Sequence, residues 1–171
     1  MFLGLIKKLS LKKLVKKNLA KTNAPSEGKI EHVGLLIDGT KFNKTKQLTK
    51  EFIKSGIDPK QIKVLVYTKN KTLKDTENIV YFRSKNITFS GKISNEKVKK
   101  FTDYSFDLLV NYYNEQQTDL IYLSLKSKAS FRAGFVLEEK RLNHFMIDVP
   151  LSNYQLFTEE LFKYLKVLNK I

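Results

Sequence analysis

An unbroken apolar run of strand length at residues 32–38, with a second strand pattern at residues 62–67, constrains the fold of this chain more than any other feature. Strands that are covered on both faces in a parallel sheet have this pattern, whereas strands with one wet face alternate apolar and polar residues. A helix capped by Asn43 and ended at Gly56 fits between the two runs. Residues 32–67 therefore have the order and the approximate length of one βαβ unit.

Strand and helix patterns alternate through the rest of the sequence. Further strands are predicted at 79–82, 87–89, 106–111, 131–135 and 144–148. Helices are predicted from a cap at Ser94 to Phe101, and from a cap at Ser152 or Asn153 onward. Residues 118–128 fit both a helix and a strand pattern. We therefore predict an α/β fold, a three-layer Rossmann-like sandwich with a mainly parallel sheet.

A cationic arm at residues 1–22 precedes this domain. Its apolar residues follow helical spacing in two stripes, one starting at Phe2 and one at Leu11, which lie nearly opposite each other at about 100° per residue. Either the helix breaks near Ser10, or one straight helix buries different faces along its length. Because an interfacial helix should keep one apolar face, the phase shift counts against a single helix lying flat on a membrane.

The arm is also the densest source of charge, with seven lysines and no acidic residue. These lysines are the candidate anion-binding residues: Lys7, Lys8, Lys12, Lys13, Lys16, Lys17 and Lys21. Uncompensated lysines repel each other along a helix, so an anionic partner should stabilise the arm. Pro25 and Gly28 indicate a linker at 23–30, and we expect a single α/β domain at 31–171.

The charge balance narrows the class of partner. The chain has 32 basic and 17 acidic side chains and a formal net charge of +15, which favours nucleic acid or an anionic lipid surface. Only Arg83, Arg132 and Arg141 are arginines, so base-specific readout is not indicated. The apolar start precedes its lysines, the wrong order for a signal peptide, and no apolar stretch approaches the ~20 residues that span a bilayer. With no cysteine present, we expect a cytoplasmic protein.

The sequence predicts no catalytic residue, metal site or cofactor. Asp38-Gly39-Thr40 resembles part of the haloacid-dehalogenase phosphatase motif, but Leu36 stands where the nucleophilic aspartate belongs. Glycine-rich dinucleotide and P-loop motifs are absent, and His32 and His144 are isolated in the sequence.

In open parallel sheets, ligands bind at the carboxyl ends of the strands, near the point where the strand order reverses. This rule nominates a strand-end cleft formed by Asp38, Thr40, Tyr67, Asn111 and Tyr112. The alternative is that Asn111 and Tyr112 merely terminate a strand and cover the sheet edge.

Segments 33–38, 106–113, 141–148 and 161–171 together resemble an uncharacterised family of lysine-rich Bacteroidetes proteins, over most of the chain. This resemblance implies a cytoplasmic bacterial protein and supplies no catalytic residues. Residues 106–135 are also similar to part of the N-terminal Rossmann-like half of heptosyltransferase-like glycosyltransferases. That similarity implies a helix at 118–128 and speaks to fold rather than to activity.

The leading hypothesis is therefore a non-enzymatic protein that binds RNA phosphates, such as those of ribosomal RNA, without base readout. A peripheral membrane protein anchored by the cationic N-terminal helix is the first alternative. A small-molecule or sugar-nucleotide enzyme with degenerate motifs and a protein-binding role are the others.

Overall fold

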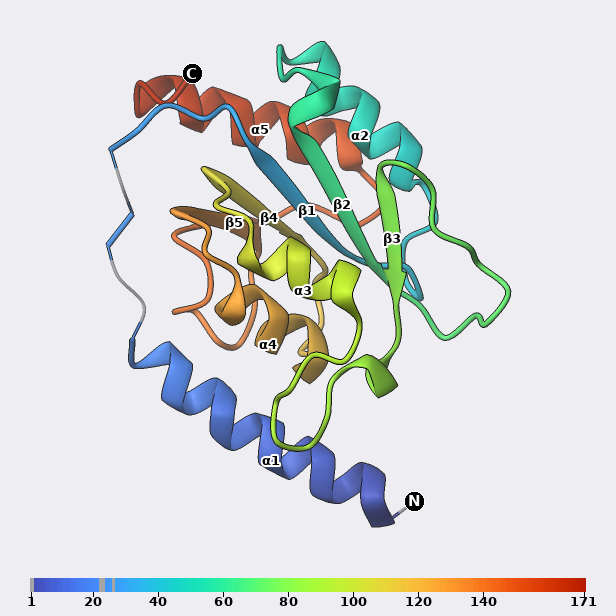
Figure 1. Ribbon diagram of the computed structural model, residues 1–171. Helices are drawn as coiled ribbons and strands as arrows, with labels where there is room; N and C mark the ends of the chain where they lie inside the picture. The colour runs from blue at the N-terminus through green and yellow to red at the C-terminus, as the bar shows by residue number, and fades with distance from the viewer. Residues whose placement is uncertain (1, 22–23, 26) are drawn as a thin grey trace.

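The computed structural model describes residues 2–21, 24–25 and 27–171. Its centre is a six-stranded sheet of order β3-β2-β1-β4-β5-β6, in which every neighbouring pair is parallel (Figure 1). The strands are β1 Val33–Asp38, β2 Ile62–Tyr67, β3 Ile79–Phe82, β4 Leu108–Tyr112, β5 Phe131–Phe135 and β6 Phe145–Ile147. The predicted α/β class and parallel sheet are confirmed.

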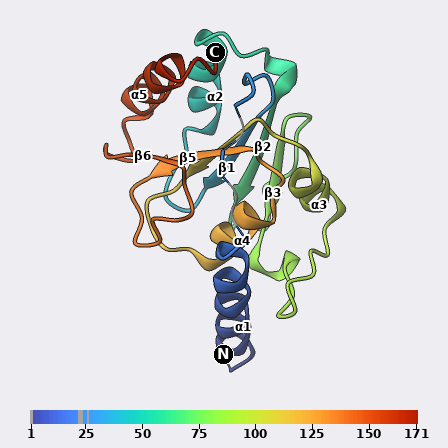
Figure 2. The ribbon, with the colours of Figure 1, turned by 90° about the vertical axis from the view of Figure 1, so that its left-hand side faces the viewer.

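Helices cover both faces of the sheet, as Figure 2 shows. The helices are α1 Phe2–Leu19, α2 Thr45–Lys54, α3 Glu96–Asp103, α4 Thr118–Lys126 and α5 Tyr154–Val167, with short 3₁₀ turns η1 Pro59–Gln61 and η2 Ser84–Asn86. Side chains of α2 and α5 join the core on one face, and those of α3 and α4 join the core on the other. Helix α1 packs on the outside of α4.

Strand β1 is covered on both of its faces, which explains why its sequence is apolar up to Asp38. All six of its residues are buried, and alternate side chains enter the two cores: Leu35 and Ile37 face α2 and α5, and Leu36 faces α3 and α4. Strand β1 pairs with β2 on one side and β4 on the other, so the strand order reverses between β1 and β4.

The structure corrects three local predictions. Residues 87–89 form no strand and make only an isolated bridge between Ile87 and Ile93. Backbone groups in this segment pair within the loop itself, through Thr88 N to Lys92 O, and Gly91 takes a positive φ of 82° in the turn. Two helix starts also differ: the N-cap of α2 is Lys44 instead of Asn43, and that of α3 is Asn95 instead of Ser94.

Two open alternatives are resolved. Residues 118–126 are helical, as the resemblance to glycosyltransferases implied. Helix α1 is one unbroken helix that docks along α4. Only its second apolar stripe is buried: Leu11 and Leu19 are among the core residues, and Leu14 and Val15 pack against them.

Candidate functional site

Of the five residues predicted at the strand ends, Asp38, Thr40 and Tyr67 lie together, whereas Asn111 and Tyr112 diverge. Asp38, Tyr67, Asn111 and Tyr112 are buried, whereas Thr40 is exposed. Asp38 Oδ1 accepts hydrogen bonds from the Thr40 amide at 2.9 Å and the Thr40 hydroxyl at 2.6 Å, which closes a local turn after β1.

Asn111 and Tyr112 point to opposite faces of β4, because adjacent strand residues alternate. Asn111 Nδ2 donates to Asn143 Oδ1 at 2.7 Å, whereas the Tyr112 hydroxyl donates to Leu151 O at 2.7 Å. Burial raises the pKa of Tyr112 far above its ordinary value. The two side chains therefore do not converge on a single ligand.

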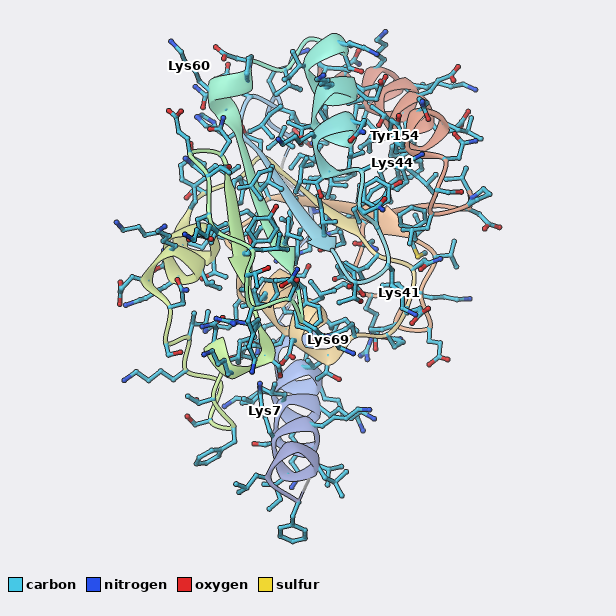
Figure 3. The ribbon with its side chains drawn as sticks, turned by 90° about the vertical axis from the view of Figure 1, so that its right-hand side faces the viewer. Lys7, Lys41, Lys44, Lys60, Lys69 and Tyr154 are labelled. Atoms are coloured by element: carbon cyan, nitrogen blue, oxygen red, sulfur yellow. The ribbon has the colours of Figure 1, made fainter. Side chains whose placement is uncertain are left out.

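An ion pair spans the loops that follow β1 and β4. Lys41 Nζ lies 3.2 Å from Glu115 Oε1, with both side chains well exposed (Figure 3 labels Lys41). Beside this bridge, burial raises the pKa of Tyr67, and the nearby carboxylates of Asp119 and Asp38 raise it further. The strand ends thus hold a compact polar cluster under the N-terminal turn of α4.

The first lysine of the arm reaches into this region. Lys7 Nζ lies 3.5 Å from Asp119 Oδ1, donates to the Ser84 hydroxyl at 2.7 Å and also donates to the Ser84 carbonyl (Figure 3). Lys7 therefore anchors α1 to α4 and η2. The remaining six lysines are all exposed: Lys8, Lys12, Lys13, Lys16, Lys17 and Lys21.

The other prominent feature of α1 is an apolar patch, defined here as Phe2, Leu3, Leu5, Ile6 and Leu9, whose side chains are between 42% and 81% exposed. This half of the helix extends away from the sheet domain in two perpendicular views (Figures 1 and 2). Ser10 Oγ donates to the Phe89 carbonyl at 2.7 Å, which ties the backbone of this loop to the helix.

The apolar and cationic residues of α1 form one continuous solvent stripe. The spacing of Phe2, Leu5, Ile6 and Leu9 continues through Lys12, Lys13, Lys16 and Lys17 along the same face. The opposite stripe holds Leu11, Leu14 and Val15, which dock on the domain. The phase shift seen in the sequence therefore separates a docking face from a free face that is apolar at one end and cationic at the other.

The expectation that the phase shift counts against a single helix lying flat on a membrane stays a prediction. Contact with α4 determines which stripe is covered, and the free face carries apolar residues and lysines together instead of on opposite sides of the helix. The continuation of the Phe2 stripe into four lysines was the signal in the sequence that would have identified the free face.

These features define a Rossmann-like α/β protein with a cationic helix docked on its α4 side. Residues 7–168 match a family of unknown function, DUF6913, and the chain belongs to this family. No curated protein and no solved structure matches the chain. Among the described residues, no helix combines the length and apolar character that crossing a bilayer requires.

Proposed function

We propose that the protein is a peripheral membrane protein that attaches to anionic lipid through the solvent face of α1. The observation that supports this most strongly is the continuous stripe of apolar residues followed by lysines, on a helix with no acidic residue. Buried apolar area and the attraction of lysines to anionic lipid are the two contributions that bind a helix to a lipid interface, and the free face of α1 offers both.

The dimensions of the helix fit this role. At 1.5 Å per residue, the segment that carries the apolar patch covers about 12 Å of the N-terminal end of the helix, so the arm would enter the interface by that end. The lysines at positions 12–17 come next along the same face. With the apolar patch in the bilayer, these lysines would lie at the lipid headgroups. Each lysine near an anionic surface contributes about 1 kcal/mol to the free energy of membrane binding.

The docking contacts hold this face outward. Lys7 and Leu11 fix the opposite side of α1 to the domain, so the helix needs no release or refolding before it meets a bilayer. Ser10, through its hydrogen bond to the Phe89 carbonyl, ties the helix to the neighbouring loop as well.

RNA phosphate binding is a second candidate, because the six exposed arm lysines offer cations to any polyanion. The apolar patch has no role in binding phosphates alone. Contiguous apolar surface on a soluble protein marks an interaction site, so lipid accounts for more of the observed face than RNA does.

The test is cosedimentation with vesicles of phosphatidylglycerol and phosphatidylcholine, with pure phosphatidylcholine vesicles as the neutral comparison. A Leu5→Ser, Ile6→Ser variant should lose about tenfold or more of its binding to the anionic vesicles. The control is Ile53→Ser and Val167→Ser, which changes two exposed apolar residues away from α1 and should bind as the unaltered protein does.

Equal vesicle binding by the unaltered protein and the Leu5→Ser, Ile6→Ser variant would overturn the lipid proposal. Salt-sensitive retention on RNA by both proteins, without vesicle binding, would overturn it in favour of RNA. Concentration-dependent self-association that the variant abolishes, again without vesicle binding, would instead assign the patch to contact between copies of the chain.

A further inference from the structure

A cationic pocket lies where α1 and α4 end and β5 begins. It is at the amino ends of the strands, whereas the polar cluster described above is at their carboxyl ends. Its volume is about 390 Å³. The polar and charged residues that carry the argument are Lys21, Ser127, Lys128, Ser130, Arg132 and His144. Three of these are cations, and none of the described residues that line the pocket is acidic.

Arg132 is the centre of this pocket and is only 7% exposed. Its Nε donates to Ser124 O at 3.2 Å and its Nη2 donates to Ser127 O at 3.1 Å, so the guanidinium caps the C-terminal end of α4. Among the described residues no carboxylate pairs with Arg132, and burial lowers its pKa. The carbonyl dipoles offset part of the cost of burying this cation, but no full negative charge does.

The backbone of β5 orients the ring of His144. The Arg132 amide donates to His144 Nδ1 at 2.9 Å. The His144 ring also stacks on Phe131, with centroids 5.4 Å apart. The pocket is therefore lined by one buried arginine and by two exposed lysines.

We propose that this pocket binds a phosphate group, carried by a small soluble phosphorylated molecule or by a lipid headgroup. Arg132 uses Nε and Nη2 on the carbonyls of α4 and its C-terminal cap, so its remaining N–H groups, those of Nη1 above all, would donate to phosphate oxygens, and the lysines supply point charges. Lys128, which is exposed, and Ser130, which is partly buried, can close on an anion that approaches Arg132. A pocket of this volume has room for a phosphate and a small attached group. The site does not depend on the proposed function of α1.

The experiment is a titration with inorganic phosphate and with glycerol 3-phosphate at constant ionic strength, followed by amide NMR shifts of residues 127–132 and by calorimetry. Saturable shifts confined to this segment are expected. Lys128→Gln combined with Ser130→Ala should weaken binding about tenfold, as the loss of charge-assisted hydrogen bonds predicts. Lys126→Gln, an exposed change two residues away on α4, is the matched control and should leave the affinity unchanged.

A third titration with vesicles of phosphatidic acid distinguishes the two sources of phosphate. Tighter binding of glycerol 3-phosphate than of inorganic phosphate supports a soluble ligand, and shifts produced by the vesicles alone support a lipid headgroup. The Leu5→Ser, Ile6→Ser variant should still bind soluble phosphate, so a failure of the membrane proposal would not affect this one. Absence of saturable shifts with all three probes, or shifts that the Lys128→Gln, Ser130→Ala variant leaves unchanged, would overturn the site.

Discussion

Lys7 and Asp119 form an ion pair of 3.5 Å that joins the first helix to the first turn of α4, with side chains only 18% and 10% exposed. Solvent screens such a pair less than it screens a pair on the open surface. The pair therefore connects the segment that carries the apolar patch to the rest of the domain.

Replacing Lys7 by Met should leave the Asp119 carboxylate partly buried without its cation. We expect the free energy of unfolding to fall by about 1–3 kcal/mol, because an unmatched buried charge costs more than a lost surface pair. Hydrogen exchange of the amides of residues 3–10 should become faster. Lys8→Met, at an exposed neighbour, is the control, and unchanged exchange in the Lys7 variant would contradict an anchoring role.

The two faces of α1 should respond differently to truncation. Leu11 is 1% exposed within the core, so Leu11→Ala should lower the free energy of unfolding by about 2–4 kcal/mol. Leu9 lies on the free face, and Leu9→Ala should change stability by less than about 0.5 kcal/mol. Urea unfolding measures both, and similar losses for the two variants would mean that the first stripe is covered in solution.

Gly134 occupies a position where no side chain fits. A Cβ atom there would lie 2.7 Å from Asn111 O and 2.7 Å from Asn143 Nδ2, inside the hydrogen-bonded pair of asparagines. Gly134→Ala should therefore destabilise the protein by about 2 kcal/mol or more in urea unfolding. Gly4 has nothing within 4 Å, and Gly4→Ala in α1 should instead stabilise by about 0.5–1 kcal/mol. A Gly134→Ala variant as stable as the unaltered protein would be inconsistent with this packing.

Asp75 should make stability depend on pH in acid. Although burial raises its pKa, hydrogen bonds from Lys97 at 2.7 Å and the Tyr81 amide at 2.9 Å lower it below the ordinary value of 3.8. A lowered pKa in the folded state contributes stability that is fully present above 3.8 and is lost as the pH falls through the folded value.

Asp75→Asn should therefore reduce the free energy of unfolding at neutral pH by about 1 kcal/mol, since the pair with Lys97 is partly solvated. The difference from the unaltered protein should shrink as the pH falls below 3.8. Chemical unfolding at a series of pH values measures this. A difference that stays constant across the acid range would exclude a role for the ionised carboxylate.

Much of the sheet could be predicted from the sequence because its signals are local. The predicted bounds of the second and third strands, 62–67 and 79–82, agree with the structure, since both segments are rich in the β-branched and aromatic residues that favour strands. Helix α4 was ambiguous for a physical reason. It lies between the sheet and α1, so residues 119–124 are all buried and its pattern lacks the polar face that marks an ordinary surface helix.

The candidate sites depended on contacts that the sequence does not encode locally. The sequence by itself determined that α1 has two opposed stripes and an uncompensated charge, because both follow from residue spacing and composition. Only packing against α4 decided that Leu11 is covered and Leu5 is free, and only the pairing of β5 and β6 beside α4 placed His144 next to Arg132. Burial of one stripe and not the other is a property of two surfaces meeting, so it could be read only from the folded chain.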